Sequence, residues 1–131
     1  MVQEVEDNPH NQPQKKLLIV DDEPQIRRML ARLLASKFDE IFTAGSGEEA
    51  EPILQRQAVT HLLVDYDLGP GSPCGEYLIT TWRQKHPAIE RALLITGKRM
   101  SHVRFPPEVD LYLSKVEDPI YLFKALQVDE G

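Results

Sequence analysis

Residues 17–24 read LLIVDDEP, and this stretch decides the fold. Its four apolar residues form a run that is short and partly β-branched, which predicts a buried β-strand. The acidic pair Asp21-Asp22 ends the strand, and Pro24 suits the first turn of a helix, where its missing N–H costs nothing. The stretch therefore predicts a strand, an acidic turn and a helix in direct succession.

Similar apolar runs predict four more strands, at residues 40–44, 61–65, 92–96 and 111–114. Helical patterns lie between these runs, among them a predicted helix at about residues 76–85. Strands that alternate with helices are typical of a parallel sheet covered on both faces. We expect an α/β fold of the flavodoxin-like, doubly wound class, with five strands. Because Pro106-Pro107 interrupts the region after the fourth strand, we expect the fourth helix to be shortened or irregular.

Local signals refine this outline. Ser46 and Glu49 have the spacing of a capping box at the start of the second helix, and Pro52 removes a backbone donor inside it. The histidines show no metal-ligand spacing, and we expect His61 to be solvated or to cap a helix. Trp82 is expected to cover the core from the third helix.

The composition is that of one ordinary globular domain. The chain has 131 residues, of which 41% are hydrophobic and 27% charged. No apolar run approaches the roughly 18 residues that span a bilayer, and the N-terminus lacks a signal-peptide pattern. Cys74, the single cysteine, cannot form an internal disulfide, which agrees with a reducing compartment. We expect a cytoplasmic protein that does not bind membranes.

The net charge of −6 is unevenly distributed. Five of the 21 acidic residues lie in residues 1–14 and 129–131, so the remaining chain has 16 acidic and 15 basic residues. We expect residues 1–14 to be a flexible leader or linker, 15–128 the folded domain and 129–131 a C-terminal tail. The acidic balance argues against nucleic acid as a direct partner, because phosphate binding requires clustered Lys and Arg.

Polar residues follow the predicted strands at their carboxyl ends: Asp21, Asp22, Asp65, Thr96 and Lys115. In a parallel sheet these ends meet at one edge, where open α/β sheets bind ligands. Carboxylates placed together repel one another unless a cation compensates, and carboxylate oxygens suit Mg²⁺. A metal ion, a lysine and a threonine hydroxyl can together hold a phosphoryl group that a carboxylate attacks.

This set, in this order over residues 15–126, resembles the CheY-like receiver domain of bacterial two-component response regulators. The resemblance implies that Asp65 is the phosphoacceptor of a phosphorelay. A sensor histidine kinase or a histidine phosphotransfer protein would supply the phosphoryl group from a phosphohistidine. Asp22, Asp65 and the backbone carbonyl of Asp67 would bind Mg²⁺, and Asp21 would hold the ion through water.

The resemblance also implies a conformational switch. Lys115 would pair with one phosphoryl oxygen, and Thr96 would donate a hydrogen bond to another. Tyr112 would turn inward as Thr96 moves, and the altered surface would control a downstream effector protein or domain. The chain would then be a signalling domain and no enzyme in the ordinary sense.

The sequence departs from the family pattern in three places. The loop after Asp65 is about two residues longer than usual: Gly69 stands where the family usually has proline, and Gly75 comes ten residues after Asp65. The interval from Thr96 to Lys115 is slightly short. Val116 follows Lys115, where the family usually has proline.

Two alternative functions stay open. One is a receiver-like interaction module that is never phosphorylated. The other is a phosphatase of the haloacid-dehalogenase type, whose Asp-x-Asp motif Asp65-Tyr66-Asp67 imitates. Those enzymes carry Asp-x-Asp on their first strand and the acidic pair last, the reverse of the order in this chain.

Overall fold

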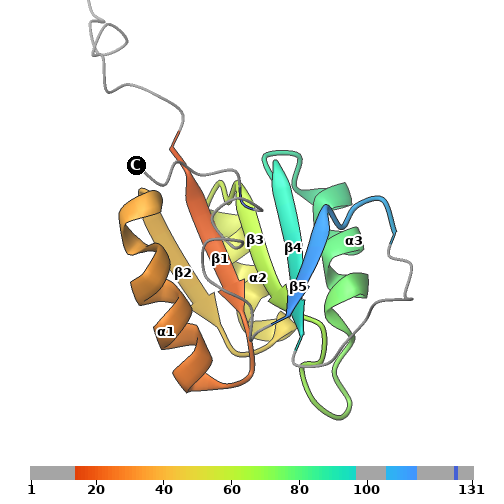
Figure 1. Ribbon diagram of the computed structural model, residues 1–131. Helices are drawn as coiled ribbons and strands as arrows, with labels where there is room; N and C mark the ends of the chain where they lie inside the picture. Colours follow the sequence, from red (N-terminus) through yellow and green to blue (C-terminus); the bar gives the residue numbers. More distant parts are fainter. Residues whose placement is uncertain (1–13, 97–105, 115–125, 127–131) are drawn as a thin grey trace, which may run out of the picture.

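Five parallel strands form one sheet in the spatial order β2-β1-β3-β4-β5 (Figure 1). The computed structural model describes residues 14–96, 106–114 and 126. The strands are β1 Lys16–Val20, β2 Glu40–Ala44, β3 His61–Asp65, β4 Arg91–Thr96 and β5 Leu111–Ser114. The first strand, β1, lies inside the sheet, and β2 lies beside it at one edge. The chain then crosses back, and β3, β4 and β5 form the other side of the sheet. This order confirms the predicted doubly wound, flavodoxin-like α/β fold.

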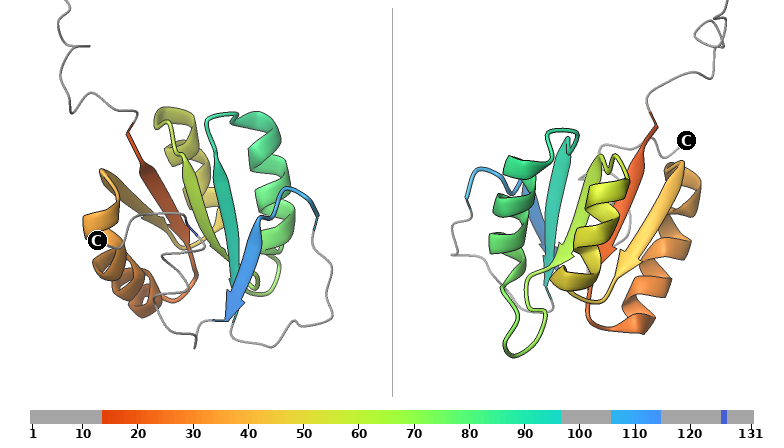
Figure 2. Two further views of the ribbon diagram at one scale, coloured as in Figure 1. Left: turned by 45° about the horizontal axis from the view of Figure 1, so that its top comes forward. Right: turned by 180° about the vertical axis from the view of Figure 1, so that it is seen from behind.

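Helices cover both faces of the sheet. In the described ranges, α1 lies on one face, while α2 and α3 lie on the other (Figure 2). Their bounds are α1 Pro24–Leu34, followed by the 3₁₀ helix η2 Ala35–Lys37, then α2 Gly47–Arg56 and α3 Gly75–Lys85. None of these helices is long and apolar enough to cross a membrane. The predicted fourth helix, between β4 and Pro106, lies outside the described residues.

Successive residues of each central strand point to opposite faces and join two separate hydrophobic clusters. Leu17 and Ile19 of β1 pack with Leu30 of α1, whereas Leu18 and Val20 belong to the cluster beneath α2 and α3. The four β1 residues are fully buried. Each such side chain stabilises the fold by roughly 1.5–3 kcal/mol relative to exposure. Burial on both faces explains why β1 is a continuous apolar run without polar alternation.

The start of α2 differs in detail from the predicted capping box. The Ser46 hydroxyl accepts a hydrogen bond from the Glu49 backbone N–H at 3.1 Å, as expected. The Glu49 carboxylate, however, accepts from the N–H of Gly45 at 2.6 Å, one residue earlier than the box requires. Pro52 does not end the helix, which continues to Arg56. Its ring is exposed, so water can reach the carbonyl that loses its donor.

The expectation of a solvated or capping His61 is wrong. Its side chain is buried, its Nδ1 lies 2.7 Å from the Thr60 hydroxyl, and its ring meets that of Phe38 edge to face. Burial is the main cause that lowers the pKa of His61. The physical reason is that β3 is a central strand, covered from its first residue onward. Trp82 is fully buried, as predicted.

Candidate functional site

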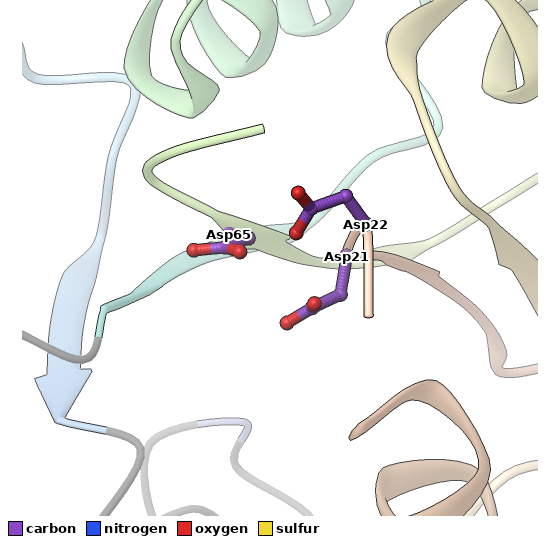
Figure 3. A group of neighbouring side chains, drawn as sticks. All are labelled: Asp21, Asp22 and Asp65. Carbon is purple, nitrogen blue, oxygen red and sulfur yellow. The ribbon is translucent and has the colours of Figure 1, made fainter. Parts of the chain in front are cut away.

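Three carboxylates converge at the carboxyl edge of the sheet. Asp21 and Asp22 follow β1, and Asp65 ends the adjacent β3 (Figure 3). One oxygen from each lies within 4.8 Å of those from the other two. Asp21 and Asp65 are buried, while Asp22 is exposed. The pairing of Val20 with Val64 brings these strand ends level, so two segments far apart in the sequence form one acidic site.

The two aspartates after β1 are held differently. Asp21 Oδ1 accepts a hydrogen bond from the Glu23 N–H at 2.9 Å, and the Asp21 N–H donates to the Ala44 carbonyl at 3.1 Å. Asp21 therefore shapes the turn between β1 and α1 with its own side chain. Asp22, the exposed member of the pair, has the carboxylate that solvent can reach.

The loop after β3 folds back on the acidic site. Asp65 Oδ1 lies 3.3 Å from the backbone N of Asp67, and the carboxylate of Asp67 accepts from the Gly69 N–H at 3.1 Å. Gly69 has a φ of 103°, a left-handed conformation that favours glycine, and a Cβ there would lie 3.7 Å from Asp22 Oδ2. The exposed Asp67 side chain thus shapes the loop and is not part of the three-carboxylate cluster.

Gly75, the first residue of α3, fits directly against the backbone of Asp65. A Cβ at this position would lie 2.3 Å from the Asp65 carbonyl oxygen and 2.8 Å from Leu94 Cδ2. Its N–H donates to the Tyr66 carbonyl at 2.9 Å. From the sequence, Gly75 was identified only as a glycine of the long loop after Asp65. Its place at a helix start after a Gly- and Pro-rich loop was the available signal for such a close approach.

The remaining predicted site residues lie on the neighbouring strands. Thr96 is buried at the end of β4, next to Ile95, which pairs with Asp65. Thr96 pairs with Ser114, the last residue of β5. Lys115 lies outside the described residues. Tyr112 is in β5, and its side chain is not described.

The donor set suits a hard divalent cation. Mg²⁺ takes oxygen ligands in octahedral geometry at about 2.0–2.1 Å, and it is usually bound by one or two carboxylates together with several waters. One oxygen from each of the three carboxylates lies within 4.8 Å of the other two, so the cluster could surround one such ion directly or through water. Without a cation, three carboxylates this close repel one another. Asp21, Asp22 and Asp65 are therefore the residues that could hold a metal.

No protein-family model and no curated protein matches this chain. Solved structures do. A response regulator protein from Burkholderia pseudomallei, solved with a phosphorylated aspartic acid, a calcium ion and citrate, is 26% identical with a TM-score of 0.71. The match covers 86% of this chain and 66% of that one.

Two further structures match over nearly their whole length. Response regulator TrrA from Thermotoga maritima, in complex with Mg²⁺ and BeF, is 29% identical with a TM-score of 0.71, over 86% of this chain and 96% of that one. The chemotaxis response regulator CheY4 of Vibrio cholerae is 26% identical with a TM-score of 0.72, over 88% and 98%. The chain therefore has the fold of the CheY-like response regulator receiver domains.

Proposed function

We propose that this chain is a phosphoacceptor in a two-component phosphorelay and that Asp65 receives the phosphoryl group. The observation that carries the proposal is the convergence of three carboxylates within 4.8 Å at the carboxyl edge of a receiver-type sheet. Two of the matching response regulators add support, since one holds a phosphorylated aspartic acid and the other Mg²⁺ with BeF.

In the proposed reaction, a carboxylate oxygen of Asp65 attacks the phosphorus of a phosphohistidine on a kinase or phosphotransfer protein. The P–O bond forms as the P–N bond breaks, and the imidazole nitrogen keeps the electron pair. Asp22, Asp65 and the Asp67 carbonyl would hold Mg²⁺, with Asp21 binding through water, as its hydrogen bond to Glu23 suggests. When bound, Mg²⁺ neutralises charge on the phosphoryl oxygens.

The conformational response would come from the strands beside β3. Phosphorylation would replace the single negative charge of the Asp65 carboxylate with the roughly two negative charges and three acceptor oxygens of a phosphoryl group. Thr96 would donate a hydrogen bond to the phosphoryl group, and Lys115, which directly follows the Ser114 partner of Thr96, would neutralise another oxygen. Tyr112 would move inward with Thr96. The favoured conformation would then present a different surface to an effector protein or domain.

The test is phosphorylation of the purified chain with acetyl phosphate and Mg²⁺, followed by intact mass spectrometry. Wild type should gain one acid-labile phosphoryl group, and chelation of Mg²⁺ should abolish the gain. Asp65→Asn should gain none. Asp67→Asn is the matched control, because the Asp67 carboxylate lies only two residues after Asp65 but outside the cluster, and this variant should label like wild type.

The other outcomes identify the alternatives. No labelling of wild type would contradict the proposal and favour an interaction module that is not phosphorylated. Steady hydrolysis of a phosphomonoester without any accumulated phosphoprotein would favour a phosphatase instead.

A further inference from the structure

Arg27, the fourth residue of α1, reaches back to the turn that carries the acidic pair. Its Nη1 donates to the backbone carbonyl of Asp21 at 2.6 Å, and its side chain is half-buried. Such charge-assisted hydrogen bonds are roughly twice as strong as neutral ones, and the guanidinium has a rigid planar geometry. The carbonyl belongs to the peptide that joins Asp21 to Asp22. The bond therefore restrains the orientation of this peptide and, with it, the position of the Asp22 backbone.

The other bonds in this turn restrain different atoms. The Asp21 N–H is held by Ala44, and the Asp21 carboxylate by Glu23. The Arg27 N–H donates to the Glu23 carbonyl at 3.1 Å, which begins the helix. Arg27 thus links the first turn of α1 to the acidic turn through both its backbone and its side chain.

Gly45 leaves room for the guanidinium. A Cβ on Gly45 would lie 3.0 Å from Arg27 Nη1 and 3.6 Å from its Cζ. The guanidinium therefore lies beside the bare Cα of Gly45, where a Cβ would also lie 3.2 Å from Glu49 Oε1. This contact offers a second way to disturb the bond, with Arg27 and all charges intact.

We propose that Arg27 is a positioning residue for the acidic cluster: by bonding the Asp21 carbonyl, it holds Asp22 in the arrangement that binds a divalent cation. The inference rests on the proposed function, because it takes the cluster to be a Mg²⁺ site. Loss of the Arg27 charge and loss of its positioning bond would change the Mg²⁺ affinity in opposite directions. Removing a nearby positive charge alone would tighten Mg²⁺ binding, whereas losing a positioning group weakens it, typically 10- to 100-fold.

The experiment is a calorimetric Mg²⁺ titration of the full chain. We expect Arg27→Met to bind at least about tenfold more weakly than wild type. Arg27→Lys, which keeps the charge and a donor, should recover part of the affinity. Arg28→Met is the matched control, because Arg28 is the exposed neighbour on the same helix, and it should bind like wild type. Equal or tighter binding by Arg27→Met would overturn the proposal.

Two further measurements keep the result decisive. If Arg27→Met does not fold, Gly45→Ala replaces it; this variant should bind Mg²⁺ severalfold more weakly, and unchanged affinity would overturn the proposal. Asp22→Asn separates the two hypotheses. If wild type binds Mg²⁺ and Asp22→Asn does not, the metal site stands, and the Arg27 variants alone decide the inference. If wild type does not bind Mg²⁺, both fail.

Discussion

Gly75→Ala measures how tightly α3 fits against the strand that ends in Asp65. The new Cβ would lie 2.3 Å from the Asp65 carbonyl oxygen, which is 0.7 Å short of the 3.0 Å that real contacts respect. Two of its three nearest atoms belong to the Asp65 backbone, which cannot rotate away. Overpacking of this kind costs about 3 kcal/mol, and the better helix propensity of alanine offsets at most about 1 kcal/mol. We expect a net loss of about 2 kcal/mol.

The assay is urea unfolding followed by fluorescence of Trp82, the only tryptophan, which is fully buried. A loss of about 2 kcal/mol should lower the midpoint by roughly 1 M urea. Gly47→Ala is the matched control, because Gly47 is also the first residue of a helix and its Cβ would meet only the flexible end of Leu78, at 3.2 Å. The control should lose less than about 1 kcal/mol. Equal midpoints for the two variants would refute the reasoning.

Three other changes test packing and polar contacts away from the acidic site. Burial lowers the pKa of His61, so the native state resists protonation that the unfolded chain accepts below about pH 6.5; stability should fall as pH drops below that value. His61→Gln should show a shallower fall between pH 7 and 5 in urea titrations, and an identical slope would contradict this. Asp110→Asn weakens the 2.6 Å ion pair with Arg83 and should lower the free energy of unfolding by about 1 kcal/mol, measured by the same titration. Glu51→Gln removes the charge from the acceptor of the Trp82 indole N–H, at 2.7 Å, and should lower stability by about 1 kcal/mol and change the Trp82 emission of the native protein; wild-type emission and stability would argue against this bond.

Much of the sheet was predictable because a strand buried on both faces has to be apolar along its whole length. The runs that became β2 and β3 have the predicted bounds, and Pro24 begins α1 as expected. The predictions that were wrong concern side chains whose surroundings depend on tertiary packing. His61 is a polar residue, but it is buried because it lies at the start of a central strand that is covered on both faces. Glu49 has the right spacing for a capping box, but its carboxylate reaches Gly45 instead.

The sequence by itself determined which chemical groups stand at the strand ends and in which order, since each strand and its final residue are read from local apolar patterns. Only the tertiary structure decided that β1 and β3 are neighbours and that Asp21, Asp22 and Asp65 share one site. Lateral strand order depends on how the crossover helices pack, which no local pattern records. The tight fit of Gly75 against the Asp65 backbone is likewise decided only by the tertiary structure. It involves atoms of residues separated along the chain, and steric contact between such atoms exists only once the fold has formed.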